Sequence, residues 1–188
     1  MKKIAIFASG SGTNAERIMQ HFSSGEAAKV SILLSNRKDA YALERAKKFN
    51  VPTHVFNRGE FYESDGVIQR LKQQGIDLIV LAGFLWLVPG NLVEAFPDKI
   101  INIHPALLPK YGGKGMYGKY VHEAVIASGD KESGITIHYV NQKYDEGRII
   151  FQAKCPISPS ETPDSLAGKI HELEYEHFPK VIEELILN

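Results

Sequence analysis

Asp77-Leu78-Ile79-Val80-Leu81-Ala82 is the stretch of sequence from which the fold class follows. Every residue after Asp77 in this stretch is apolar, so a strand formed here has no polar face. Such a strand is typical of the centre of a parallel sheet that helices cover on both sides. The stretch therefore predicts an α/β protein.

Strand-like and helix-like segments alternate on the N-terminal side of this run. The expected strands are short apolar runs, and the expected helices have apolar residues three or four positions apart. The strands are expected at 4–8, 30–34 and 54–56, and the helices at 14–22, 40–49 and 60–74. The alternation indicates parallel strands joined by crossover helices.

The C-terminal half departs from this alternation. A short helix is expected from Pro89 to about Phe96, a strand at 99–102 and a helix at 120–128. Strands at 135–140 and 148–153, with a turn around Asp145-Glu146-Gly147, predict a hairpin. A long helix begins at Thr162, and Pro179 is a point where it can bend. We expect a Rossmann-like open, mostly parallel twisted sheet with helices on both faces and an antiparallel addition near the C-terminal end, in one domain, 1–188.

Composition narrows the classes of partner. Lys and Arg together equal Asp and Glu, at 22 each, so no net field favours nucleic acid or an anionic membrane. Cys155 is the only cysteine, which excludes an internal disulfide and a cysteine metal cluster. No apolar run approaches the roughly 20 residues that span a bilayer, and no signal-peptide pattern follows Met1. We expect a cytoplasmic protein without a metal, acting on small molecules.

A glycine turn, Gly10-Ser11-Gly12-Thr13-Asn14, follows the first expected strand. Ligands of open parallel sheets bind beyond the carboxyl ends of the strands, where helix N–H groups attract anions. The turn therefore predicts a phosphate site. A purely structural turn with Thr13 or Asn14 as the helix N-cap is the alternative. The turn also matches the start of a dinucleotide motif, and Asn36-Arg37 could hold the 2′-phosphate of NADP.

Polar residues gather where the strand after Lys99 ends. Asn102 and His104 are two positions apart, so a strand that continues to Pro105 points both side chains the same way. An imidazole and a carboxamide can supply the proton and the oxyanion donor that acyl transfer needs. The alternative is a packed histidine beside a turn asparagine. Asp145, if it meets His104, would favour the imidazolium, and His138 is a further candidate for the same crevice.

Four segments taken in order carry a family resemblance: Gly10-Ser11-Gly12-Thr13-Asn14, Leu81-Ala82-Gly83-Phe84-Leu85, Ile101-Asn102-Ile103-His104-Pro105-Ala106-Leu107-Leu108-Pro109 and Asp145-Glu146-Gly147. The third segment resembles the folate-dependent formyltransferases. The glycine turn narrows this to the phosphoribosylglycinamide formyltransferases (GAR transformylases), where GAR is glycinamide ribonucleotide. The resemblance covers nearly the whole chain and implies the formyltransferase fold.

The resemblance implies transfer of the formyl group of 10-formyltetrahydrofolate to the amine of GAR. The products would be formylglycinamide ribonucleotide and tetrahydrofolate, in de novo purine (IMP) biosynthesis. It implies that Asn102 and protonated His104 stabilise the oxyanion, while Asp145 holds His104 charged and helps relay a proton through water. The implied GAR contacts are Gly10, Ser11, Gly12, Thr13, Asn14 and Glu174, with Glu176 as the alternative to Glu174. The implied folate contacts are Arg58, Leu85, Trp86, Leu87, Val88, Asn102, Val140, Asn141, Gln142, Lys143, Tyr144 and Asp145.

Departures from the family pattern occur at two positions. Ala106 stands where many relatives have serine, and Trp86 stands where several have arginine. Trp86 could stack on the folate or cover core surface. We expect the glycine-rich run 112–118 to be a mobile lid, because the matching loop of the family moves.

Four rival functions stay open on the sequence. Methionyl-tRNA formyltransferase and formyltetrahydrofolate hydrolase resemble the chain around His104, but each carries an additional domain for which we expect no room in 188 residues. An NADP-dependent reductase and a non-catalytic phosphate sensor would use only the glycine turn. We expect a monomer or a homodimer.

Overall fold

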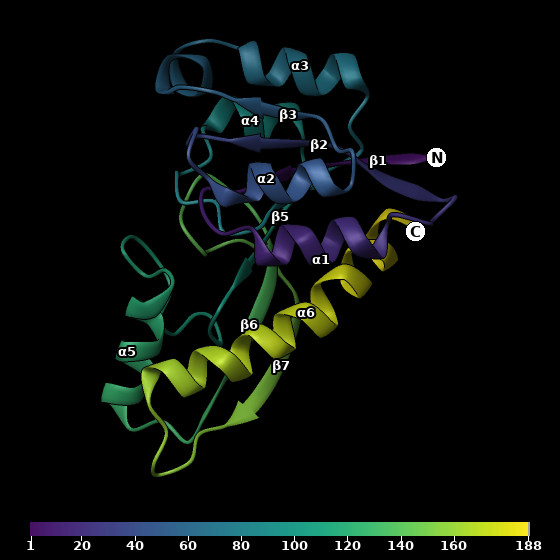
Figure 1. The fold of residues 1–188 in the computed structure, drawn as a ribbon. Helices are drawn as coiled ribbons and strands as arrows, with labels where there is room; N and C mark the ends of the chain where they lie inside the picture. The colour runs from purple at the N-terminus through teal and green to yellow at the C-terminus, as the bar shows by residue number, and fades with distance from the viewer. Residues whose placement is uncertain (188) are drawn as a thin grey trace.

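One sheet organises the computed structural model, which describes residues 1–187 (Figure 1). Its strand order is β3-β2-β1-β4-β5-β6-β7. The strands are β1 (Lys2–Phe7), β2 (Ala28–Ser35), β3 (Thr53–Val55), β4 (Leu78–Leu81), β5 (Ile100–His104), β6 (Glu132–Tyr139) and β7 (Ile149–Pro156). Strands β1 to β5 pair in parallel, whereas β6 is antiparallel to both β5 and β7. The predicted mostly parallel sheet with an antiparallel addition is confirmed.

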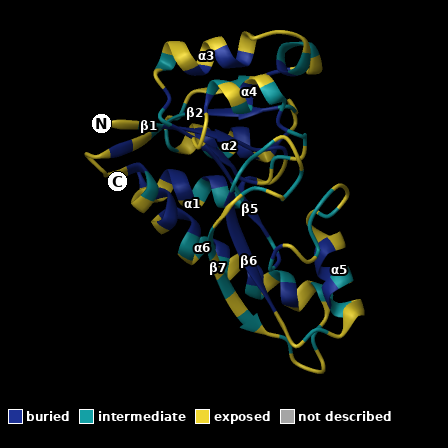
Figure 2. Cartoon of the chain, turned by 180° about the vertical axis from the view of Figure 1, so that it is seen from behind, coloured by how far each residue is buried: buried dark blue, intermediate teal, exposed yellow. Residues whose placement is uncertain are grey.

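Helices cover both faces of the sheet. They are α1 (Thr13–His21), α2 (Tyr41–Lys48), the π-helical turn η1 (Gly59–Glu63), α3 (Gly66–Gln74), α4 (Gly90–Ala95), α5 (Lys119–Ser128) and α6 (Pro163–Leu187). Alternate residues of a strand point to opposite faces. Accordingly Ile4 and Ile6 of β1 pack with α1, α2, α5 and α6, whereas Ala5 and Phe7 pack with η1, α3 and α4. Figure 2 shows the central strands largely in the dark blue of buried residues, whereas the edge strand β7 and the outer helix faces are partly exposed.

The chain order reverses between β1 and β4. From β1 the chain proceeds outward to β2 and β3, then returns to β4 on the other side of β1. Crossover helices on opposite faces leave a crevice at the carboxyl ends of these two strands, which is where open sheets bind ligands. Residues 10–14 follow β1 and residues 82–88 follow β4, so the sheet topology brings both segments to this crevice.

One predicted helix is wrong. The segment 60–74 is not continuous, because Ser64 is extended, with φ −143° and ψ 169°, between η1 and α3. Local hydrogen bonds explain the break. Glu60 N donates to Asn57 Oδ1 and Asn57 N donates to Glu60 Oε2, each at 3.0 Å, which forms a capping box at the start of η1. Ser64 Oγ accepts from Gly66 N at 3.3 Å where α3 begins.

The C-terminal predictions hold. Strands β6 and β7 form the predicted hairpin, with Asp145 in the connection between them. A side chain at Gly147 would put its Cβ 1.6 Å from Tyr139 O, so only glycine fits there. Helix α6 runs through Pro179 without interruption. None of the described helices has both the length and the apolar content to cross a membrane.

Candidate active site

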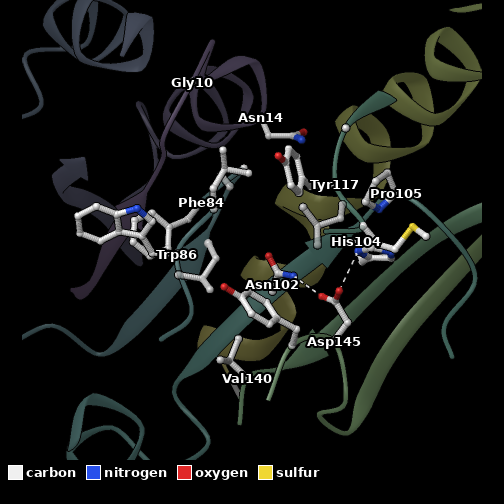
Figure 3. Close-up of a pocket in the computed structure, with 18 of the residues that line it drawn as sticks. Gly10, Asn14, Phe84, Trp86, Asn102, His104, Pro105, Tyr117, Val140 and Asp145 are labelled. Carbon is white, nitrogen blue, oxygen red and sulfur yellow. Dashed lines mark hydrogen bonds and ion pairs between the residues drawn. The ribbon is translucent and has the colours of Figure 1, made fainter. Parts of the chain in front are cut away.

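A cavity of about 580 Å³ lies at the carboxyl ends of the central strands. Its walls include the glycine turn after β1, the segment after β4, the end of β5, the connection between β6 and β7, and residues of α5 and α6. Gly10, Asn14, Trp86, His104 and Asp145 all face this one space in Figure 3. The sheet therefore joins the predicted phosphate turn and the predicted catalytic group in a single site.

The glycine turn is held by α2. Ala42 N donates to Gly10 O at 3.1 Å, and Arg45 Nε donates to Ser11 O at 2.8 Å. Gly12 is the N-cap of α1 with φ 73°, and a Cβ there would lie 2.5 Å from Ala42 Cβ. The alternative of Thr13 or Asn14 as the N-cap is therefore wrong. The first N–H groups of a helix have no intrahelical acceptor, so this turn can bind an anion through its backbone.

Asn14 and Glu174 meet across the cavity wall. Asn14 Nδ2 donates to Glu174 Oε2 at 2.9 Å, which joins α1 to α6. Glu174 is only 6% exposed, and burial raises the pKa of its carboxyl to about 7 although the Asn14 hydrogen bond opposes the rise. Glu176, the alternative acid, is exposed and pairs with Lys180 at 3.4 Å. The structure thus brings Glu174 to the glycine turn and leaves Glu176 outside the cavity.

Asn102, His104 and Asp145 converge as predicted (Figure 3). Strand β5 continues to His104, so both of its polar side chains point to one face. His104 Nε2 lies 2.7 Å from Tyr111 O, and since a carbonyl can only accept, Nε2 carries a proton. His104 Nδ1 faces Asp145 Oδ2 at 3.5 Å. Asp145 Oδ2 also accepts from Gly113 N at 3.0 Å, which fixes the carboxylate.

His138 orients the amide of Asn102. The two residues are cross-strand partners in β5 and β6. His138 Nδ1 donates to Tyr139 O at 2.9 Å, so Nε2 can accept from Asn102 Nδ2 at 3.2 Å. Asn102 Nδ2 has a second N–H, whose contact with Asp145 Oδ1 is long at 3.5 Å. This second N–H is the one available to an oxyanion.

The surroundings of His104 act on its pKa in opposite directions. Burial lowers the pKa of its imidazole, and Asp145 and the Tyr111 carbonyl raise it, but burial has the larger effect. Asp145 therefore acts in the predicted direction, although the net shift in the pKa of His104 is downward. Burial would raise the pKa of Asp145, but contacts with His138, His104 and the Gly113 N–H together lower it. The pair is best described as a neutral imidazole beside a carboxylate.

The predicted folate contacts fall into two groups. Most of them line the cavity: Leu85, Trp86, Leu87, Val88, Asn102, Val140, Lys143, Tyr144 and Asp145. Asn141, Gln142 and Arg58 do not. Asn141 Oδ1 accepts from Lys143 N at 2.9 Å, and Gln142 Nε2 lies 3.5 Å from Glu94 Oε1.

Trp86 belongs to an aromatic group at one end of the cavity. Its ring packs edge-on against Phe56, with the ring centroids 6.1 Å apart, and it remains part of the cavity wall. The Arg58 guanidinium lies 5.1 Å from the Trp86 ring and 5.2 Å from the Tyr62 ring. Trp86 thus covers apolar core surface, as one interpretation expects, and its place in the cavity wall leaves stacking on the folate as a prediction.

The residues proposed for NADP do not reach the cavity. Arg37 pairs with Asp39 at 2.7 Å on the surface, and Asn36 Oδ1 accepts from Ser9 Oγ at 2.6 Å. Neither residue lines the cavity. Within residues 1–187, no group of three or more metal-ligating side chains has the geometry to hold an ion.

Sequence reasoning missed two histidines of the cavity wall. His122 of α5 and His171 of α6 both line it. His171 lies three positions before Glu174, so helical spacing puts both on the same face of α6. That spacing was a usable signal once Glu174 was assigned. Nothing in the local sequence of α5 marks His122.

Comparisons with known proteins agree with this site. Residues 2–182 match the model of the formyl transferase family, and the chain belongs to that family. Its relatives include a chloroplastic phosphoribosylglycinamide formyltransferase from Arabidopsis thaliana, 42% identical over 96% of this chain and 64% of the relative. The phosphoribosylglycinamide formyltransferase of Haemophilus influenzae is 40% identical over 97% of this chain and 86% of the relative. The crystal structure of glycinamide ribonucleotide transformylase 1 from Geobacillus kaustophilus superposes with a TM-score of 0.88 at 38% identity, covering 99% of each chain.

Proposed function

We propose that this protein is a phosphoribosylglycinamide formyltransferase. It transfers the formyl group of 10-formyltetrahydrofolate to the amine of GAR in de novo purine biosynthesis. The observation that carries the proposal is the single cavity joining the turn at 10–14 to Asn102, His104 and Asp145. A phosphate sensor would need only the turn, and an NADP reductase would need Arg37 at the site.

The substrates are assigned to opposite ends of the cavity. The turn takes the phosphate of GAR through the N–H groups at the start of α1. The apolar segment 85–88, with Trp86, and the wall from Val140 to Tyr144 take the folate ring system. The reacting amine and formyl carbon then meet beside His104. Arg58, Asn141 and Gln142 remain proposed folate contacts that would have to act from outside the present cavity wall.

The chemistry begins with attack of the GAR amine on the formyl carbon. A new C–N bond forms and the formyl oxygen becomes an oxyanion, which the second N–H of Asn102 stabilises. Because the pKa of His104 is lowered, Nδ1 starts without a proton and can accept one from the attacking amine. The Asp145 carboxylate stabilises the imidazolium so formed. Return of that proton to the folate nitrogen, as the C–N bond to folate breaks, gives formyl-GAR and tetrahydrofolate.

The remaining assignments follow the same proposal. Both packed faces belong to one sheet, which supports a single domain over 1–188. We assign the protein to the cytoplasm, as a monomer or homodimer that requires no metal and binds neither nucleic acid nor membrane.

Formyl transfer assayed with GAR and 10-formyltetrahydrofolate tests the proposal. His104→Ala should lower kcat about 100-fold or more, because it removes the group that moves the proton. His177→Ala is the matched control, since His177 packs on Phe151 outside the cavity and should keep wild-type turnover. A wild-type protein that shows no transfer with both substrates present would refute the function. A His104→Ala variant as fast as wild type would refute the mechanism.

A further inference from the structure

We infer that His122 is a further substrate-binding residue, whose Nε2 forms a hydrogen bond with a ribose hydroxyl of GAR. The inference rests on the proposed function and adds a contact that the family resemblance does not assign. It begins from an imidazole that is almost fully buried yet has no partner in the described chain.

The first observation is the isolation of the His122 ring. His122 is 4% exposed and lines the cavity. Its Nδ1 is sealed from solvent and has no hydrogen-bond partner among the described residues. Nε2 is therefore the nitrogen that a ligand in the cavity can reach. Since Nδ1 is the unsatisfied buried atom, a ligand at Nε2 would add a hydrogen bond to a ring that otherwise has none, without relieving Nδ1.

The second observation is the place of His122 between the two ends of the substrate. His122 of α5 and His171 of α6 come from two helices that pack together, and both line the cavity with His104 of β5. After the larger effect of burial, the charges of His171 and His104 also lower the pKa of His122. His171 lies one helical turn before Glu174, beside the phosphate turn, and His104 marks the reacting amine. With GAR bound as proposed, its phosphate at residues 10–14 and its amine beside His104, we assign His122 to the middle of the substrate, where the ribose connects the phosphate to the glycinamide.

The third observation is the chemistry available there. Burial lowers the pKa of His122 and so favours its neutral ring, which can accept or donate a hydrogen bond but cannot neutralise an anion. The same cavity also presents the Glu174 carboxylate and the Asn14 carboxamide, whose Oδ1 has no hydrogen-bond partner among the described residues. None of these three side chains, His122, Glu174 and Asn14, is a fixed cation. A neutral hydroxyl matches this environment better than a phosphate oxygen does.

The experiment compares three variants that differ in where a polar atom remains. His122→Leu removes both nitrogens, His122→Gln keeps an amide near the Nε2 position, and His122→Asn keeps one near the sealed Nδ1 position. We expect His122→Leu and His122→Asn to raise the KM for GAR roughly tenfold, the value of one net hydrogen bond, with kcat nearly unchanged. His122→Gln should recover most of the wild-type KM. His177→Leu is the control outside the cavity.

Deoxyribose analogues of GAR identify the group that is bound. One of the two analogues, 2′-deoxy-GAR or 3′-deoxy-GAR, should have a kcat/KM about tenfold lower than that of GAR with the wild-type enzyme. With His122→Leu, that same analogue should have the same kcat/KM as GAR. A His122→Leu variant with the wild-type KM, or with undiminished discrimination against both analogues, would overturn the inference. A wild-type enzyme inactive on GAR would instead refute the proposed function, so the two failures are distinguishable.

Discussion

At the scale of single residues, the site depends on groups whose ionisation burial has altered. Glu174 and His104 are both taken out of water, and each is pushed toward its neutral form. Asp145 stays ionised because several donors surround it. A neutral imidazole next to a carboxylate can accept a proton and then be stabilised as a cation, which is the order of events that the proposed transfer requires.

Glu174→Gln should change how stability depends on pH. The carboxyl of Glu174 has a folded-state pKa of about 7, above its ordinary 4.5. Its contribution to stability is therefore full below pH 4.5 and is lost as pH rises toward and through 7. The variant cannot ionise, so at pH 8 it should be more stable than wild type by about 3 kcal/mol and at pH 4.5 no more stable.

Urea denaturation at both pH values measures this difference. Glu176→Gln, on the exposed side of α6, is the control and should show no such gain. Equal stability of wild type and Glu174→Gln at pH 8 would contradict the buried, ligand-free carboxyl described above.

Asp145→Asn should shift the pH dependence of catalysis. Asp145 raises the pKa of His104, so its neutralisation lowers that pKa further. If neutral His104 accepts the proton, the acid limb of the kcat/KM profile moves to lower pH while the maximal rate falls. NMR titration of the His104 ring supplies the direct measurement. An alkaline limb that moves to lower pH in the variant would instead show that the protonated ring is the active form.

At the scale of elements, the strand ends and turns were the most predictable parts. The strand apolar on both faces predicted a central position, and β4 lies between β1 and β5. Asn102 and His104 share a face because β5 continues to His104. The break at Ser64 was not predictable from apolar spacing, since the spacing in 60–74 suits one helix. The side chains of Asn57 and Ser64 instead bind backbone N–H groups at the start of η1 and of α3, which favours two separate segments.

Gly12→Ala should destabilise the element pair α1 and α2. The substitution forces a side chain into the left-handed region and puts a Cβ 2.5 Å from Ala42 Cβ. Together these effects should cost about 3 kcal/mol in the free energy of unfolding. Gly10→Ala is the matched control, because a Cβ at Gly10 has no neighbour within 4 Å and should leave stability near wild type. Chemical denaturation of both variants tests the contrast.

At the scale of the whole molecule, the site depends on contacts that sequence spacing cannot reveal. The burial of Glu174 follows from α6 packing on α1, and the link between His138 and Asn102 follows from antiparallel register. Arg58 stacks on Trp86 because a π-helical turn, absent from the prediction, carries Tyr62 beside it. Local patterns predicted the type of each element, whereas these contacts depend on how distant elements dock.

GAR should stabilise the fold as a whole. The cavity wall combines residues 10–14 with His171 and Glu174, so only the folded chain can bind. GAR at 100 times its Kd should raise the free energy of unfolding by about 2.7 kcal/mol. Thermal denaturation across a GAR concentration series measures the effect. A Tm independent of GAR would contradict binding at this cavity.

The hydrogen bond between Asn14 and Glu174 has a consequence for biosynthesis of the protein. Its two residues are 160 positions apart. A nascent chain completes the glycine turn early in translation, but that turn lacks its acidic neighbour until α6 has left the ribosome and docked on α1. The complete binding site proposed here therefore forms only after the last helix of the chain has been synthesised and has joined the fold.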